Sequence, residues 1–174
     1  PDVVRQTVIT LRSLPLDKRP LVARIDPLVN FGETKGRFAG TRLIHNFCVR
    51  WSGVVRCPRD GEYRFYLNSD DGSQLFINGA LAVDNGGNHA MREKEGRVIL
   101  TAGDHTLRLD FVQGEGEAGC ILSWAGEGLA KEVIPATALW HQPASGRPAD
   151  RSSLEPGLRA EFYELGGRLE TFPD

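Results

Sequence analysis

The chain has 174 residues, of which 40% are hydrophobic and 25% are charged, and its formal net charge is -2. These values are typical of one globular domain with a proper core, or of one domain plus a piece of a neighbour. The sequence contains no basic cluster that could neutralise a phosphate backbone and no apolar stretch of the roughly 20 residues that span a bilayer, so we expect neither nucleic-acid binding nor membrane insertion.

The chain begins at Pro1 without an initiating methionine or a signal segment, and we expect it to be a piece of a longer protein. Residues 1–20 form a segment of uncertain structure, because residues 3–11 fit both a short helix and a strand. From residue 21 to residue 40 turn-forming residues dominate, which favours a surface connection with short extended pieces. We therefore expect the main domain to cover residues 21–141.

Two stretches after residue 43 alternate between apolar and polar residues, as strands with one buried face do. Their apolar positions are Phe47, Val49 and Trp51 in the first stretch and Tyr63, Phe65 and Leu67 in the second. Between them, Pro58-Arg59-Asp60-Gly61 is a turn sequence, in which Pro presets the bend and Gly accepts positive φ. This pattern predicts an antiparallel hairpin.

The strongest hairpin signal is Asn78-Gly79, because both central positions of a type I′ turn need positive φ. Further strands are predicted at residues 97–101, 107–111 and 120–124. Strands that recur about every 8–12 residues with turns between them are typical of a sandwich or barrel. We therefore predict an all-β fold, an antiparallel β-sandwich or jelly-roll-like barrel.

The sequence lacks the usual catalytic motifs, such as Gly-x-Ser-x-Gly and His-Glu-x-x-His. Two carboxylate pairs, Glu93 with Glu95 and Glu115 with Glu117, could in principle do acid–base work. Both pairs are expected in polar loops without apolar neighbours that would raise a pKa, so we expect solvated charges and no enzymatic activity.

Three cysteines, Cys48, Cys57 and Cys120, are too few and too scattered for a disulfide framework. All three lie in apolar runs, which favours small buried side chains. A Cys48–Cys57 or Cys57–Cys120 bridge stays open as an alternative.

The stretch Asn68-Ser69-Asp70-Asp71-Gly72-Ser73 sets two adjacent carboxylates between two apolar runs. Successive side chains of an extended strand point to opposite faces, so Asp70 and Asp71 can chelate one ion only if the backbone bends between them, as a cis peptide would allow. Carboxylate, amide and carbonyl oxygens suit Ca²⁺, which takes about 6–8 oxygens and could share open positions with vicinal sugar hydroxyls. The alternative is an Asx turn closed by Gly72.

Residues 47–124 resemble the protective-antigen fourteen-kilodalton (PA fourteen) domain family. The matching segments are Val49-Arg50-Trp51-Ser52-Gly53, Gly61-Glu62-Tyr63-Arg64-Phe65, Ser69-Asp70-Asp71-Gly72-Ser73, Leu75-Phe76-Ile77-Asn78-Gly79, Ala102-Gly103-Asp104-His105 and Leu122-Ser123-Trp124. The resemblance implies a β-sandwich of jelly-roll or barrel-like shape and, as in many members, glycan binding by a non-catalytic accessory module.

The resemblance also implies a site. In lectin members of the family, two consecutive aspartates joined by a cis peptide bind Ca²⁺, and a later loop adds an Asn side chain and backbone carbonyls. The corresponding loop is residues 113–119, which carries Gln113 where an Asn would match. The loop that carries Asn85, Asn88 and His89 could reach the same rim, or could be a plain solvated turn. The candidate carbohydrate-binding residues are Asp70, Asp71, Asn85, Asn88, His89 and Gln113, with Asp70 and Asp71 as the metal ligands.

Towards the end of the chain, residues 142–153 have linker composition. In the segment 154–174, Gly157-Leu158-Arg159-Ala160-Glu161-Phe162-Tyr163 resembles the first strand of the family. Either a second tandem copy begins near Leu154, or this segment completes the sandwich, whose own first strand is missing or degenerate in residues 1–13. We favour the second alternative.

Together these patterns predict a glycan- or polysaccharide-binding module of a larger exported or cell-surface protein, located outside the cell or in the periplasm. Adjacent domains of the parent chain are the other expected partners. The competing hypothesis is a structural or protein-interaction domain without a sugar site. A hydrolase would require turnover of a glycoside by this chain alone, which we do not expect.

Overall fold

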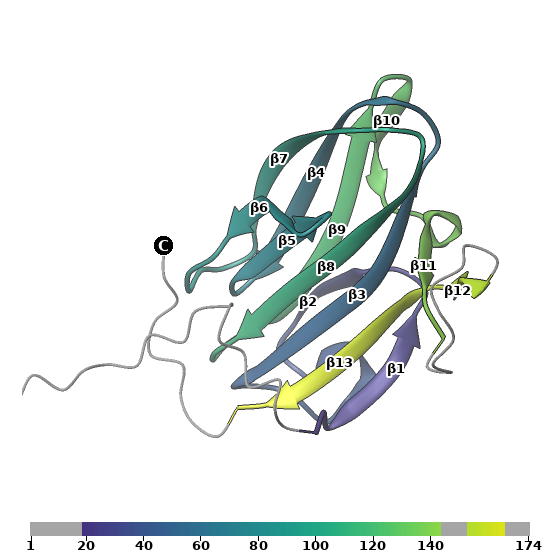
Figure 1. Cartoon of the computed structure of the whole chain (residues 1–174). Coiled ribbons are helices and arrows are strands. Elements are labelled where there is room, and N and C mark those ends of the chain that lie inside the picture. Colours follow the sequence, from purple (N-terminus) through teal and green to yellow (C-terminus); the bar gives the residue numbers. More distant parts are fainter. Residues whose placement is uncertain (1–18, 144–152, 166–174) are drawn as a thin grey trace, which may run out of the picture.

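The computed structural model describes residues 19–143 and 153–165. They form two packed antiparallel sheets (Figure 1). The strands of the larger sheet are β1 (Val22–Asp26), β3 (Phe47–Cys57), β5 (Ser73–Ile77), β6 (Ala80–Asn85), β8 (Gly103–Gln113), β11 (Leu139–His141), β12 (Glu155–Pro156) and β13 (Leu158–Glu164). Those of the smaller sheet are β2 (Asn30–Thr34), β4 (Gly61–Asp70), β7 (Arg92–Leu100), β9 (Ala118–Gly126) and β10 (Leu129–Val133).

The larger sheet has eight strands in the order β1-β13-β3-β8-β5-β6, and β11 pairs with both β3 and β12. The smaller sheet has five strands in the order β10-β9-β4-β7, with β2 paired to β9. The predicted all-β antiparallel sandwich is confirmed. Within the described ranges, no helix has both the length and the apolar character that a bilayer-spanning segment needs.

The core lies between the two sheets and follows from the alternation along the strands. Phe47, Val49 and Trp51 of β3 point inward and are completely buried, as are Phe65 and Leu67 of β4. Burial of such side chains is the main favourable contribution to folding. The indole of Trp51 also needs a polar partner, and its Nε1 donates a hydrogen bond of 2.8 Å to the buried Asp26 carboxylate.

The predicted hairpin between residues 47–51 and 63–67 is wrong. β3 pairs with β8, β13 and β11 in the larger sheet, whereas β4 pairs with β7 and β9 in the smaller one. Residues 58–60 therefore carry the chain from one sheet to the other. Turn residues identify the reversal but not the sheet that receives the next strand, because two facing sheets bury the same apolar positions that a hairpin would.

The Asn78-Gly79 hairpin is confirmed. Asn78 and Gly79 have φ values of 50° and 78°, and Ile77 pairs with Ala80 across the two-residue turn. Both central residues thus lie in the left-handed region that a type I′ turn requires.

β13 lies between β1 and β3 and is an integral part of the larger sheet (Figure 1). It pairs Phe162 with Val49 and with Val22, and it buries Leu158, Ala160 and Phe162 completely. If the segment 154–174 completes the sandwich, the alternative that we favour, this pairing is required. The predicted helix-or-strand segment before residue 19 and most of the predicted linker, residues 144–152, lie outside the described residues.

The three cysteines are buried free thiols. Neither of the two bridges that the sequence left open is formed. Burial raises the pKa of Cys48 to about 12 and that of Cys57 to about 11, so both thiols stay protonated near neutral pH.

Strands β6 and β7, from different sheets, approach each other closely at Gly96 of β7. A Cβ atom at this position would overlap the carbonyl oxygen of Ala82 on β6. We expect Gly96→Ala to lower the free energy of unfolding by about 1–3 kcal/mol, because backbone must move to admit the methyl group. Gly32→Ala is the control, since a Cβ there meets no atom within 4 Å, and a change within about 0.5 kcal/mol is expected. Denaturant unfolding measures both, and equal effects would contradict the prediction.

Candidate functional site

The predicted aspartate pair lies where β4 ends and the chain crosses to β5. The peptide bond between Asp70 and Asp71 is cis, as predicted. Both side chains are buried, with 6% and 1% of their surface exposed. The two carboxylates have separate surroundings.

Asp71 joins two loops at this end of the sandwich. Its Oδ1 accepts a hydrogen bond from the backbone N–H of His89 at 3.0 Å, and its Oδ2 accepts one from Gly114 at 2.9 Å. Burial raises the pKa of Asp71, and these two hydrogen bonds oppose the rise. Since both oxygens are used, Asp71 holds the loops 86–91 and 114–117 against the end of β4.

Gln113 completes this arrangement from the end of β8. It is fully buried, and its Oε1 accepts a 2.9 Å hydrogen bond from the backbone N–H of Asp71. Its Nε2 donates to the carbonyl oxygens of Glu117 at 2.7 Å and of Glu115 at 3.4 Å. The side chain therefore shapes the loop that follows it and is enclosed by protein on all sides.

Asn85 has a similar position at the end of β6. It is fully buried, its Nδ2 donates to the carbonyl oxygen of Arg92 at 2.9 Å, and its Oδ1 accepts from Arg92 Nε at 3.1 Å. Asn88 is exposed at the tip of the same loop, and His89 is half-buried. The structure thus links Asp71, Asn85, His89 and Gln113 through hydrogen bonds, while Asn88 is exposed to solvent.

Asp70 faces a cluster of carboxylates that the sequence did not indicate. One carboxylate oxygen each of Glu33, Asp70 and Glu117 lie within 4.8 Å of one another. Burial raises the pKa of Asp70 to about 7, and the nearby Asp71 and Glu33 carboxylates add to the rise. Lys35 Nζ lies 3.0 Å from Glu117 Oε1 and lowers the pKa of Glu117. Glu117 is half-buried and ion-paired, and its pKa is not raised. The predicted loop position of Glu93 and Glu95 is wrong, because both lie on strand β7.

Glu33 reaches this cluster because β2 runs beside β9. Asp70 pairs with Gly119 of β9, and the β2–β9 pairing is irregular between Phe31 and Thr34. Gly119 lacks a side chain, and a Cβ there would lie 3.2 Å from the backbone nitrogen of Glu33. Glu33 was expected in a surface connection, and no local pattern marks it, since its position arises from strand pairing alone.

The fold and the geometry define a β-sandwich domain with a cluster of three carboxylates, one of which belongs to a cis-linked aspartate pair. The chain belongs to the PA14 domain family, whose model matches residues 7–138.

Known relatives include regulatory proteins and sugar-binding domains. Anti-sigma-I factor RsgI3 of Acetivibrio thermocellus is 32% identical over 142 residues, which are 80% of this chain and 21% of that protein. A solved anti-sigma factor domain-containing protein is 28% identical, with a TM-score of 0.65 over 73% of this chain and 44% of that one. The chain therefore spans less than half of either relative. The PA14 sugar-binding domain from an RTX adhesin, 19% identical, shares the fold over 66% of this chain and 75% of its own, with a TM-score of 0.57.

The loop-holding role of Asp71 predicts a loss of stability on its removal. Asp71→Ala leaves the buried N–H of Gly114 without its acceptor, and we expect the free energy of unfolding to fall by about 1–3 kcal/mol. Asp84→Ala is the matched control, because the exposed Asp84 also accepts a backbone hydrogen bond, from Gly86, yet should change stability by no more than about 0.5 kcal/mol. Urea unfolding in a chelator measures both, and an Asp71→Ala protein as stable as the control would contradict the assignment.

The raised pKa of Asp70 predicts a pH dependence in the absence of metal. Between pH 4 and about pH 7 the folded chain binds more protons at Asp70 than the unfolded chain, so this group makes stability fall as pH rises through that range. Asp70→Asn removes the effect. We expect the variant to gain melting temperature relative to the wild type on going from pH 4 to pH 8, in thermal unfolding with chelator present. Parallel pH profiles for the two proteins would refute this prediction.

Proposed function

We propose that this chain is a non-catalytic carbohydrate-binding module whose ligand binds beside Asp70 with the help of Ca²⁺. The observation that supports this most directly is the convergence of the Glu33, Asp70 and Glu117 carboxylates within 4.8 Å. Asp70 is buried, Glu117 is half-buried and Glu33 is exposed, so the cluster opens to solvent on one side. Carboxylate oxygens are the ligands that a hard cation prefers.

The donor set fits calcium in its chemistry. Glu33, Asp70 and Glu117 would hold the ion, and Ca²⁺ would offer its remaining coordination positions to vicinal hydroxyl groups of a sugar. The sequence suggested Asp70 and Asp71 as the ligand pair. In our proposal Asp71 instead acts through the loops that it holds, because both of its oxygens already accept backbone hydrogen bonds.

The residues behind the cluster would make the site rigid before a ligand arrives. Asp71 holds two loops through its hydrogen bonds. Gln113 holds the loop before Glu117 by donating to the carbonyl oxygen of Glu117, and Asn85 holds the loop of Asn88 and His89 by donating to the carbonyl oxygen of Arg92. A site that is ordered in advance loses less conformational entropy on binding. In this proposal the exposed Asn88 and the half-buried His89 contact the glycan from the rim, while Asn85 and Gln113 support it from within.

Lys35 would compete with the cation. Its ammonium group lies 3.0 Å from Glu117 and partly neutralises the three carboxylates when no metal is bound. Its side chain is 84% exposed, so it can turn away at little cost. Calcium binding would replace one exposed ion pair by coordination to the whole cluster.

The proposed setting is the outside of a cell, at the cell surface or in the periplasm, as part of a longer protein. Polysaccharides are found there, and a PA14 domain of similar fold is described as the sugar-binding domain of an RTX adhesin. The similarity to anti-sigma factor proteins supports a second candidate, in which this chain is an interaction domain of a longer regulatory protein and binds no sugar. Neighbouring domains of that protein would then be its partners.

Calcium titration of the wild-type chain by calorimetry tests the metal site. We expect a dissociation constant on the order of 0.1–1 mM, the range of extracellular calcium modules, and at least about tenfold weaker binding by Glu33→Gln and Asp70→Asn. Glu93→Gln is the control, since Glu93 is a half-exposed carboxylate on β7 that pairs with Lys131 and should leave the affinity unchanged. No calcium heat in the wild type would rule out the metal-dependent proposal.

Pull-down of the chain by insoluble cellulose, xylan and chitin, with calcium or with chelator, tests the sugar site. We expect retention on at least one polysaccharide that falls in chelator and in Asp70→Asn, and no release of reducing sugar. Calcium binding without retention on any of the three would favour the interaction-domain candidate.

A further inference from the structure

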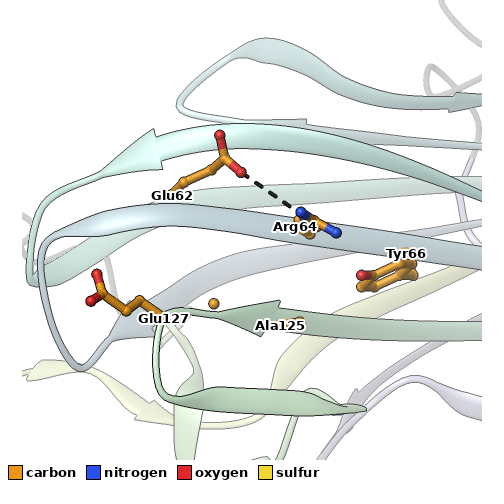
Figure 2. A pocket seen from close by; sticks show the side chains of 6 residues that line it. Glu62, Arg64, Tyr66, Ala125 and Glu127 are labelled. Carbon is orange, nitrogen blue, oxygen red and sulfur yellow. Dashed lines mark ion pairs between the residues drawn. The ribbon is translucent and has the colours of Figure 1, made fainter.

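The outer face of the five-stranded sheet carries a hollow that is separate from the acidic cluster. It is lined by Glu62, Arg64 and Tyr66 of β4, by Ala125 and Gly126 at the end of β9, and by Glu127 in the turn that follows (Figure 2). Its volume is about 370 Å³, within the range of about 300–1,000 Å³ that is usual for small-ligand sites. It faces away from the core, so a ligand can reach it without any movement of the sheets.

Strand register explains why this part of the sheet is hollow. Every second residue of β4 faces outward, so Glu62, Arg64 and Tyr66 stand in one row. On the adjacent β9, Ala125 is directly opposite Arg64, and Gly126 is opposite Tyr63. The small side chain of Ala125 thus leaves a low floor beside a row of long side chains, whereas a side chain at Gly126 would point toward Tyr63 on the core side.

The polar groups that line the hollow are only loosely paired. Glu62 Oε1 lies 3.9 Å from Arg64 Nε and 3.7 Å from Arg97 Nη1, and Figure 2 marks the first of these pairs. Both distances exceed that of a hydrogen bond. The charges nevertheless offset one another, so the hollow offers strong donors and acceptors with little net charge. These properties favour an uncharged ligand rich in hydroxyl groups over an anion or a cation.

Tyr66 adds an aromatic surface at one end of the hollow (Figure 2). Its ring is half-buried, and Lys131 Nζ lies 4.1 Å from the ring centroid while also pairing with Glu93. This cation–π contact is modest in strength at an exposed site and favours one orientation of the ring. An aromatic ring beside alternating donors and acceptors matches a pyranose, which has an apolar C–H face and hydroxyl groups that both donate and accept.

We propose that this hollow is a second sugar-binding site, which takes one uncharged pyranose unit and needs no cation. The hydroxyl groups would accept from Arg64 and donate to Glu62 and Glu127, and the sugar ring would lie against Tyr66. Asp70 follows Tyr66 by four residues on the same strand, about 13 Å at the rise of a β-strand. One polysaccharide chain could then contact both sites, and the second contact would raise the overall affinity through a high effective concentration.

Amide NMR shifts of the full chain, recorded in chelator, test this site apart from the calcium site. The probes are the methyl glycosides of glucose, galactose, mannose and xylose, each titrated to high millimolar concentration. We expect at least one of them to shift the amides of Arg64, Tyr66, Ala125 and Gly126, and Asp70→Asn to leave these shifts unchanged. No shift at these amides with any of the four probes would overturn the proposal.

The lining residues provide the second half of the test. Tyr66→Ala should weaken the binding about tenfold, which corresponds to about 1.4 kcal/mol. Ile99→Ala is the control, because Ile99 is an exposed residue of the same sheet on β7 and does not line the hollow. The amide spectrum of each variant reports whether it is folded. Unchanged affinity in a folded Tyr66→Ala protein would also overturn the proposal.

Discussion

The hydrogen bonds of the Asp71 carboxylate are the interactions that hold the crossing loops at one end of this sandwich. At this end the chain crosses between the sheets at residues 71–72, 86–91 and 114–117, where the sheet hydrogen-bond pattern is interrupted. A buried backbone N–H without a partner is costly, and the crossing loops cannot all satisfy one another. Asp71 accepts from the N–H groups of His89 and Gly114, and its own N–H donates to Gln113. One side chain and one peptide group thereby fix all three crossings.

Two adjacent aspartates of identical chemistry have different roles because their surroundings differ. Asp71 is enclosed and receives two backbone hydrogen bonds, which favour its charged form. Asp70 is buried beside Glu33 and Glu117 and receives no such compensation, so its pKa rises to about 7. Asp71 stabilises the loops, whereas Asp70 brings a third carboxyl group next to those of Glu33 and Glu117. This group of three carboxyls is the physical basis of the proposed cation site.

The two proposed sites lie on different kinds of surface. Its end carries loops whose backbone is held by buried side chains, whereas the outer face of the smaller sheet carries a row of side chains set by strand register. Both surfaces include residues of β4, so the hydrogen bonds between β4 and its neighbouring strands fix the backbone positions of Asp70 and of Glu62, Arg64 and Tyr66. β4 connects the two surfaces, since its outward row begins at Glu62 and the strand ends at Asp70. The same strand thus sets the distance between the two proposed contacts.

The sequence by itself indicated most of the strands and the type I′ turn at Asn78-Gly79, because these are encoded by residues that are neighbours in the chain. The residues alone left the geometry at Asp70-Asp71 open, and the cis peptide was expected from the family resemblance. The sequence also indicated Asp71, Asn85, His89 and Gln113 as residues of one region. Only the tertiary structure decided that β3 and β4 belong to different sheets and that Glu33 and Glu117 meet Asp70. These features arise from contacts between segments far apart in sequence, for which alternation and turn residues carry no information. Whether β4 pairs with β3 in one sheet or packs against it from the facing sheet depends on the packing of the whole core.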